Sequence, residues 1–359
     1  MAKLRYGMVG GGPGAFIGDA HRKAVSLDGT AELVAGCFSR TPDKTLEQGK
    51  ALGLEPERCY ASYQEMAEAE AAREDGIDFV VIVTPNNTHY AIAKAFLEAG
   101  IHVACDKPLV TTVQEAEDLK KTADEKDLLF MVTYTYTGHV TMAEYPQGWL
   151  YDENSWGGKQ GEWRCDPAQS GRVNCLGDLG THVENAVATV TGLKIKRVLA
   201  KMDVVVPGRK LDDNDQILVE YEGGATGINW TSQFAIGCDN SLRLRIYGSK
   251  GTLLWFQENP EEVILIREDG IARSVKRGYG AVTPDAAKYE RLPSGHTEGW
   301  LEAMGNLYDS FGACVKAKKE GHFTPELIDY PTIEEGVAGL KYVEACLESN
   351  AKGNVWVEV

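Results

Sequence analysis

A glycine-rich turn between a short apolar stretch and a helical pattern constrains this chain more than any other feature. Residues 4–11 (LRYGMVGG) predict a buried strand, and a helix is expected over 18–27. Between them, Gly10, Gly12 and Ala15 match the pattern G-x-G-x-x-A. In this pattern the first glycine permits a tight turn, the second admits a pyrophosphate, and the small third residue lets helix and strand pack closely. The turn therefore predicts a dinucleotide-binding unit, with a flexible glycine loop as the alternative.

Strand and helix patterns alternate over the first 134 residues. Apolar runs that predict further strands lie at 32–39, 78–84, 101–105 and 128–134. Helical patterns lie between them, at 43–52, 64–73, from about 89 to 100, and at 113–126. This alternation predicts a doubly wound parallel sheet, in an α/β N-terminal domain over 1–134 that binds NAD(P).

The pattern changes after residue 136. Tryptophans, glycines and polar residues crowd 138–175 with little periodicity, and a helical pattern follows at 177–192. Runs with a period of two then lie at 197–206, 216–221, 225–234, 242–247, 252–257 and 263–267, and helical patterns lie at 298–319 and 333–350. We expect a C-terminal α+β domain over 135–359, built on a large open, mainly antiparallel sheet, that binds substrate and forms oligomers. Its last helices can pack back on the first domain.

Charge and composition exclude several classes of partner. Of the 359 residues, 53 are acidic and 37 are basic, which gives a net charge of −16. This charge argues against nucleic acid or an anionic membrane as a partner. No apolar run approaches the roughly 20 residues that span a bilayer, and no apolar signal region precedes the first strand. The eight cysteines form no C-x-x-C pair, so we expect reduced thiols in a cytoplasmic protein and no metal site, with disulfides or zinc as alternatives.

A lysine stands at the end of the fourth predicted strand. Lys107 follows Cys105 and Asp106 and precedes Pro108. The proline fixes its own φ and keeps the preceding residue out of the helical region. Because ligands bind at the carboxyl ends of strands in an open α/β sheet, the Lys107 ammonium is a candidate site group. A Lys-Pro pair can also be no more than a turn.

Asp178 and His182 have a spacing of i, i+4. On an α-helix, this spacing places two side chains about 40° apart on one face. A carboxylate beside an imidazole can orient the ring, fix its tautomer and stabilise its protonated form. The alternative is a helix-start aspartate and an unrelated core histidine.

Four motifs in a fixed order carry a family resemblance. They are Gly10–Ala15, Thr84–His89, Asp106-Lys107-Pro108 and Gly177–His182. Together they make the chain similar to the family of glucose–fructose oxidoreductase, inositol dehydrogenase and the rhizopine-catabolism oxidoreductases (Gfo/Idh/MocA), in which most members carry Glu-Lys-Pro at the third motif. The resemblance implies a Rossmann domain, a second domain on an open antiparallel sheet, and hydride transfer between a secondary hydroxyl of a sugar or cyclitol and a nicotinamide cofactor.

The resemblance also implies roles for individual residues. Lys107 would hold the reacting oxygen, His182 would act as general base, and Asp178 would place the substrate and the histidine. By motif and resemblance, the cofactor-binding residues are Gly10, Gly12, Pro13, Gly14, Ala15, Phe16, Ile17, Ser39, Arg40, Thr84, Pro85, Asn86, Asn87, His89, Asp106 and Lys107. The substrate-binding residues are Lys107, Tyr136, Trp163, Arg164, Asp178, His182 and His296. Removing a hydride from a secondary alcohol needs a base for the hydroxyl proton, and a cation favours the developing alkoxide.

Three further segments look like the branch that oxidises levoglucosan and the third carbon of glycosides. They are Trp163–Pro167, Ser170-Gly171 and Gly295–Trp300. Tryptophan and arginine suit a sugar site, because aromatic faces stack on C–H faces and arginine donates to hydroxyls. The alternatives are a core Trp163, an ion-paired Arg164 and a structural His296.

Other functions remain open at this point. They are an inositol dehydrogenase, a two-substrate sugar oxidoreductase that does not release its cofactor, and a non-catalytic nucleotide-sensing protein. The last is disfavoured because Lys107, Asp178 and His182 are all present.

The expected cofactor is NAD, exchanging or tightly bound, and NADP is the alternative. Sheets that prefer NAD usually end the second strand with an acidic residue. Here Phe38, Ser39 and Arg40 stand at that place and the nearest carboxylate is Asp43. Arg40 can face a 2′-phosphate or stack on adenine. A homo-oligomer, dimer or tetramer, is also expected, because alternate side chains of the second sheet must point away from its helices.

Overall fold

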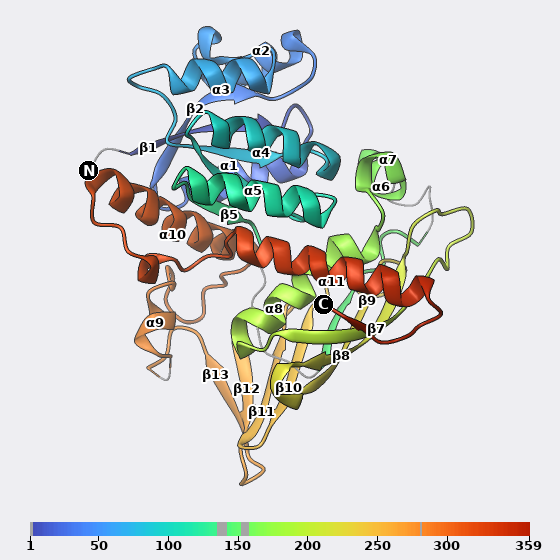
Figure 1. Cartoon of the computed structure of the whole chain (residues 1–359). Coiled ribbons are helices and arrows are strands. Elements are labelled where there is room, and N and C mark those ends of the chain that lie inside the picture. Colours follow the sequence, from blue (N-terminus) through green and yellow to red (C-terminus); the bar gives the residue numbers. More distant parts are fainter. Residues whose placement is uncertain (1–2, 135–141, 152–157, 281) are drawn as a thin grey trace. The chain divides into compact units, whose positions relative to one another are not determined.

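The computed structural model describes residues 3–134, 142–151, 158–280 and 282–359. The chain forms two compact units, and most of their helices and strands are labelled in Figure 1. The first comprises Met1–Thr135 and Trp300–Val337, and the second comprises Tyr136–Gly299 and Ala338–Val359. The sequence-based division after residue 134 did not assign residues 300–337 to the first unit, although it allowed the last helices to pack there.

The first unit is built on a parallel sheet of five strands in the order β2-β1-β3-β4-β5. Its strands are β1 (Leu4–Gly10), β2 (Ala31–Cys37), β3 (Phe79–Val83), β4 (His102–Cys105) and β5 (Phe130–Val132). This confirms the predicted doubly wound sheet. The chain runs outward from β1 in one direction to β2 and in the other to β3, so the switch point at which such sheets bind ligands lies at the ends of β1 and β3.

Helices supply the apolar faces that cover this sheet. They are α1 (Phe16–Ser26), α2 (Pro42–Ala51), α3 (Tyr63–Ala71), α4 (His89–Glu98), α5 (Val113–Glu125) and α10 (Trp300–Glu320). α1 packs on α10, and α4 packs on α3 and α5. Phe79 and Val81 of β3 share one buried cluster with Phe311 and Val315 of α10. The late helix α10 therefore completes the core of the first unit.

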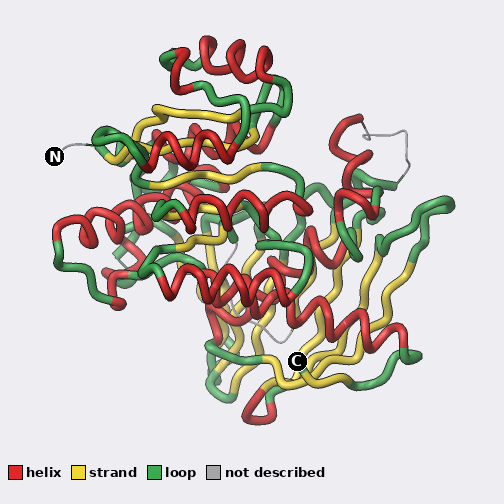
Figure 2. The backbone as a smooth tube through the Cα atoms, turned by 45° about the horizontal axis from the view of Figure 1, so that its top comes forward, coloured by secondary structure: helices red, strands yellow, loops and turns green. Residues whose placement is uncertain are grey.

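The second unit is built on nine strands in the order β13-β12-β11-β10-β6-β9-β8-β7-β14. They are β6 (Met142–Pro146), β7 (Ile195–Asp203), β8 (Asn214–Tyr221), β9 (Thr226–Ser232), β10 (Arg243–Gly248), β11 (Gly251–Phe256), β12 (Glu262–Ile266), β13 (Ala272–Lys276) and β14 (Val357–Glu358). Figure 2 shows its strands in yellow, side by side. The pair β6–β9 is parallel and the other pairs are antiparallel. The predicted open, mainly antiparallel sheet is thus confirmed.

The α-helices and one π-helical turn of the second unit precede β7 or follow β13. They are α6 (Gly158–Cys165), α7 (Pro167–Ser170), a π-helical turn (Leu176–Gly180), α8 (Thr181–Thr191) and α9 (Pro284–Ala287). The last helix, α11 (Ile333–Ala351), passes from the first unit to the second after Val337. Within the part of the chain that the structure describes, no helix combines the length and apolarity that crossing a bilayer requires.

Candidate active site

The turn between β1 and α1 has the geometry that its glycines require. Gly10 (φ +90°) and Gly14 (φ +75°) have positive φ. A Cβ at Gly10 would lie 2.6 Å from the Val83 oxygen, and one at Gly12 would lie 2.7 Å from the Phe38 oxygen. No described atom lies within 4 Å of a Cβ added at Gly14. An open, glycine-rich turn at the N-terminal end of α1 fits a pyrophosphate held by backbone N–H groups.

The residues that follow this turn have different surroundings. Pro13 is exposed and Ala15 is half-buried. Phe16 is 67% exposed and stacks on Trp300, with 5.9 Å between ring centroids and 6° between ring planes. Ile17 packs against the core. Of these two residues in the first turn of α1, Phe16 therefore offers the larger surface to a ligand.

The end of β2 carries no carboxylate. Ser39 is half-buried, its backbone N–H donates to the Thr45 hydroxyl (3.0 Å), and its own hydroxyl accepts from the Thr41 N–H (3.1 Å). Arg40 and Asp43 are both exposed. One cation and one anion are thus accessible near the position where a ribose is expected.

His89 links the ends of β3 and β4. Its Nε2 lies 2.8 Å from the Thr84 oxygen, and its Nδ1 lies 3.0 Å from the Pro108 oxygen and 3.2 Å from the Leu109 oxygen. The ring is 1% exposed. Because both ring nitrogens face backbone carbonyls, we assign His89 to the support of the site. Its predicted contact with the cofactor stays a prediction.

The segment between β3 and α4 holds the other residues expected near the nicotinamide. Pro85 precedes the short 3₁₀ turn Asn86–Thr88. Asn86 is buried and Asn87 is exposed. The Thr88 hydroxyl lies 2.8 Å from that of Thr84. These polar side chains follow β3 directly, at the switch point of the sheet.

Asp106 fixes the backbone that presents Lys107. Its Oδ1 accepts from the Lys107 N–H (2.9 Å) and from the Thr133 hydroxyl (3.0 Å), and lies 4.0 Å from Nε2 of His21. Burial lowers the pKa of His21, and the Asp106 charge opposes that shift. Lys107 is half-buried, and its peptide bond to Pro108 is cis. The Lys107 side chain therefore leaves from a defined point at the end of β4.

Asp178 and His182 come from consecutive elements. Asp178 lies in the π-helical turn Leu176–Gly180, and His182 lies in the first turn of α8. The helical pattern predicted over 177–192 is confirmed, but its first residues form a π-helical turn and not an α-helical one. His182 is 5% exposed, and its ring lies 6.0 Å from that of Tyr145, between centroids. π-helical turns are frequent at functional sites.

A charged and aromatic group surrounds Asp178. Its Oδ2 accepts from Nε of Arg164 (3.0 Å) and from Nε2 of Gln233 (2.9 Å). The Arg164 guanidinium lies 4.3 Å from the Trp163 ring centroid and 5.2 Å from that of Trp149. We call these five residues the Asp178 cluster. The ion pair that was the alternative for Arg164 is therefore present, with Asp178 as its partner. The predicted substrate contact of Arg164 stays a prediction.

Sequence reasoning missed several polar residues beside this cluster. The Asn240 Oδ1 accepts from the Tyr145 hydroxyl (2.6 Å) and from Nε2 of Gln147 (2.7 Å), and the Gln147 Oε1 accepts from the Trp149 indole (2.6 Å). Trp149 is thereby oriented by a hydrogen-bonded chain. The predicted substrate contact Tyr136 lies outside the described residues.

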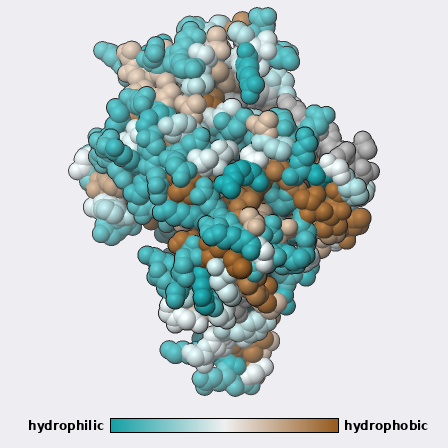
Figure 3. Space-filling view, turned by 45° about the vertical axis from the view of Figure 1, so that its right-hand side comes forward, coloured by the Kyte–Doolittle hydropathy of each residue, from teal (hydrophilic) through white to brown (hydrophobic). Residues whose placement is uncertain are grey.

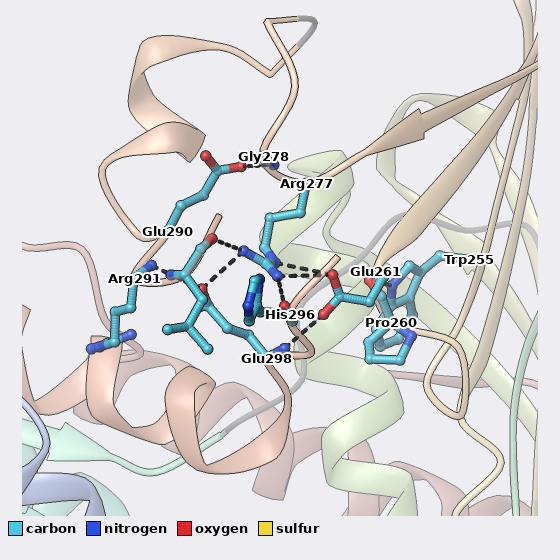
Figure 4. A network of polar contacts seen from close by, with 10 residues as sticks. Trp255, Pro260, Glu261, Arg277, Gly278, Glu290, Arg291, His296 and Glu298 are labelled. Atoms are coloured by element: carbon cyan, nitrogen blue, oxygen red, sulfur yellow. Dashed lines mark hydrogen bonds and ion pairs between the residues drawn. The ribbon is translucent and has the colours of Figure 1, made fainter. Parts of the chain in front are cut away.

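His296 belongs to a loop that is held by an ion-pair network (Figure 4). Arg277 donates to the carboxylates of Glu261 (2.9 Å) and Glu298 (2.9 Å) and to the His296 carbonyl. The Glu298 N–H in turn donates to Glu261 (2.7 Å). The His296 side chain is exposed. The backbone of this loop is fixed while the imidazole stays accessible.

Family models match both units of the chain. Residues 4–134 match the model of an oxidoreductase family with an NAD-binding Rossmann fold, and residues 136–254 match the GFO/IDH/MocA C-terminal domain. The chain belongs to the GFO/IDH/MocA oxidoreductase family. The predicted family membership is confirmed.

Two curated relatives and one solved structure show the range of this GFO/IDH/MocA protein's similarity. It is 36% identical to the uncharacterized oxidoreductase YfiI of Bacillus subtilis, over 99% of this chain and 96% of that protein. It is 25% identical to the levoglucosan dehydrogenase of Pseudarthrobacter phenanthrenivorans, over 100% and 99% of the two chains. An inositol dehydrogenase homolog from Azotobacter vinelandii, solved with NADH and myo-inositol, is 35% identical with a TM-score of 0.92, over 99% and 98% of the two chains.

Proposed function

We propose that this protein is an NAD-dependent dehydrogenase that oxidises a secondary hydroxyl of a pyranose sugar or glycoside, the third carbon of a glucoside being one candidate. The Asp178 cluster carries the proposal, because Arg164 lies against two tryptophan rings and is hydrogen-bonded to Asp178. Aromatic faces pack on the C–H faces of sugars, while guanidinium and carboxylate groups bind hydroxyls. The NAD-binding family model supports the reaction type.

The proposed chemistry assigns one task to each polar residue. The bound nicotinamide supplies the hydride acceptor. Lys107 donates a hydrogen bond to the reacting oxygen and favours its negative charge, and His182 takes the hydroxyl proton. Asp178, held by Arg164 and Gln233, is a fixed acceptor for a neighbouring hydroxyl.

A cyclitol is the second candidate substrate. The inositol dehydrogenase homolog of Azotobacter vinelandii, solved with myo-inositol, is 35% identical over nearly the whole chain, whereas the levoglucosan dehydrogenase is 25% identical. A ring with only C–H and hydroxyl groups fits the same aromatic and polar residues. A sugar oxidoreductase that keeps its cofactor bound is a further variant of the proposal.

A substrate panel tests the function. Purified protein is incubated with NAD and with pyranoses, glucosides, levoglucosan or inositols, and reduction of nicotinamide is followed by absorbance. We expect reduction with at least one pyranose or glycoside, and a higher KM for it, but not for NAD, in Trp163→Ala. Reduction by inositols alone would select the cyclitol. The proposal would be contradicted if no compound reduced the nicotinamide and if, in addition, no sugar were reduced by a cofactor that remains bound to the protein.

The same panel decides the cofactor. We propose NAD, because residues 4–134 match an NAD-binding family model and the Azotobacter vinelandii homolog was solved with NADH. The measurement is kcat/KM for NAD and NADP on one substrate. A preference for NADP above about tenfold, equivalent to about 1.4 kcal/mol, would show that Arg40 binds a 2′-phosphate.

A homodimer or tetramer is the proposed assembly. Leu218 of β8 and Ile228 of β9 are register partners, and each is 43% exposed, whereas Tyr221 and Leu244 of the same sheet are buried. Trp230, one alternate position from Ile228, adds to this face. The surface view in Figure 3 also carries several hydrophobic areas. Contiguous apolar area of this kind is usually covered by a partner.

Light scattering tests the assembly. We expect at least twice the 39.2 kDa chain mass, and a shift toward the monomer in Ile228→Lys. Leu46→Lys, at an exposed leucine of α2, is the matched control and should not change the mass. A monomeric unchanged protein would show that the outer face of the sheet is not an interface.

A cytoplasmic location also belongs to the proposal. Among the described residues the eight cysteines form no disulfide, and five of them are buried. Reduced thiols are typical of proteins from a reducing compartment.

A further inference from the structure

Three titratable side chains meet in the interior of the second unit, beside the π-helical turn. They are Cys175, Asp212 and Asp215; their Sγ and carboxylate oxygens lie within 4.8 Å of one another, and all three residues are buried. Cys175 directly precedes the turn, Asp212 lies in the loop before β8, and Asp215 lies in β8. The functional site uses none of them directly.

Asp212 holds the chain as it enters the turn. Its Oδ1 accepts from the Asn174 N–H (2.8 Å), and its Oδ2 accepts from the Leu176 N–H (2.7 Å). Its backbone oxygen also accepts from the Cys175 N–H (3.2 Å). Two backbone donors on one carboxyl group favour the anion, since both oxygens are then acceptors. Asp178 follows Leu176 by only two residues.

Asp215 has the opposite environment. Its Oδ2 accepts from the Thr231 hydroxyl (3.1 Å), and its Oδ1 receives no hydrogen bond from the described residues. Burial raises the pKa of Asp215 well above its usual value, and the charge of Asp212 raises it further. Burial also raises the pKa of Asp212, but the Leu176 and Asn174 N–H groups oppose that shift. Two carboxylates this close and this buried cannot both be charged, so the proton belongs on Asp215.

The other titratable groups that face the pair are neutral. Cys175 lies beside it at the start of the turn, and Tyr342 and Cys346 face it from α11. Burial raises the pKa of all three well above their usual values. Asp213, the neighbour of Asp212 in sequence, has other partners. Its carboxylate accepts from the Val205 and Val206 N–H groups (2.7 and 2.9 Å) and forms an ion pair with Arg209.

We propose that Asp212 and Asp215 form a buried carboxylate–carboxylic acid pair that sets the position of the π-helical turn, so that Asp212 is a positioning residue for Asp178. This inference rests on the proposed function, since it assigns the pair to the placement of the substrate-binding carboxylate. In the pair, the Asp215 O–H donates to Asp212. The Asp212 carboxylate in turn accepts from the two backbone N–H groups of Asn174 and Leu176. The turn is thereby held from the loop before β8.

Isosteric substitutions test the two assignments separately. In Asp215→Asn the amide donates to Asp212 as the carboxylic acid does, so kcat should stay close to that of the unchanged protein. In Asp212→Asn an NH₂ group replaces one acceptor and meets a backbone N–H, so the turn shifts. We expect kcat to fall by about tenfold or more, the scale of a small displacement of a reacting group, while NAD affinity is unchanged.

Asp213→Asn is the matched control. It also replaces a buried aspartate that accepts from two backbone N–H groups. These N–H groups belong to Val205 and Val206 and not to the π-helical turn. It should lower the stability and leave kcat unchanged. A loss of kcat in Asp213→Asn equal to that in Asp212→Asn would mean that general destabilisation, and not position, explains the result.

A second readout needs no substrate. Asp215 has a raised pKa in the folded protein, so its contribution to stability is complete below the ordinary pKa of about 4 and is lost as pH rises through the raised value. Asp215→Asn should therefore gain free energy of unfolding relative to the unchanged protein as pH rises from about 4. If the free energy of unfolding changed equally with pH in the unchanged protein and in Asp215→Asn, Asp215 would not carry the proton. One equivalent of a divalent metal in the purified protein that is lost in Asp215→Asn would also contradict the carboxylate–carboxylic acid pair. These outcomes are independent of whether the substrate panel succeeds.

Discussion

Replacing Lys107 or His182 by alanine should lower kcat by at least about a hundredfold, the typical effect of removing an acid–base group. Lys107 leaves from a backbone that Asp106 fixes at the end of β4, and His182 is buried in the first turn of α8. We expect neither change to unfold the protein, because each removes one polar side chain and leaves the buried apolar side chains in place. The measurement is kcat and KM on the best substrate of the panel, together with the dissociation constant of NAD.

Matched controls use a lysine and a histidine on the surface. Lys121→Ala truncates a lysine whose side chain is 72% exposed, and His322→Ala truncates a histidine whose side chain is 61% exposed. Both controls should keep their full activity. Turnover near that of the unchanged protein in Lys107→Ala or His182→Ala would remove that residue from the mechanism.

Gly10→Ala should abolish NAD binding and strongly destabilise the first unit. Gly10 has φ +90°, and an added Cβ would lie 2.6 Å from the Val83 oxygen and 2.9 Å from Cγ2 of Thr84. The positive φ and the overpacking together cost about 3 kcal/mol or more. Relief of this clash must separate the ends of β1 and β3, where the cofactor is expected to bind. Urea unfolding and titration with NAD measure the two effects.

Gly53→Ala separates backbone strain from collision. Gly53 has φ +75°, and no described atom lies within 4 Å of an added Cβ. It should lose only about 1–2 kcal/mol of stability and bind NAD normally. Equal behaviour of Gly10→Ala and Gly53→Ala would show that the contact with Val83 does not constrain the turn.

Sequence patterns were sufficient for the nucleotide-binding sheet because its signals are local. The glycine turn, the apolar strands and the Asp106-Lys107-Pro108 segment each depend on neighbours in the chain. The Asp178 cluster was predicted only in part, because Gln233 meets Asp178 across 55 positions. No spacing near Gln233 or Trp149 indicates such a contact.

The π-helical turn shows a second limit. The apolar pattern of 177–192 fits an α-helix, and one additional residue in a turn leaves that pattern almost unchanged. The turn requires glycine at two positions. A Cβ at Gly180 would lie 2.5 Å from Cδ1 of Leu176, and one at Gly177 would lie 2.9 Å from Cγ2 of Val173. The anchor at Asp212 comes from a loop 36 residues away from Leu176. Only tertiary structure joins these parts.

The membership of α10 in the first unit determines how the chain can be divided. Phe311 and Val315 of α10 fill the same cluster as Phe79 and Val81 of β3, although more than two hundred positions separate them. A fragment that ends at residue 134 would expose that face of the sheet to water. The first unit is therefore a discontinuous folding unit that surrounds residues 136–299 in sequence. It can be completed only after the strands β6 to β13 of the second unit have been synthesised.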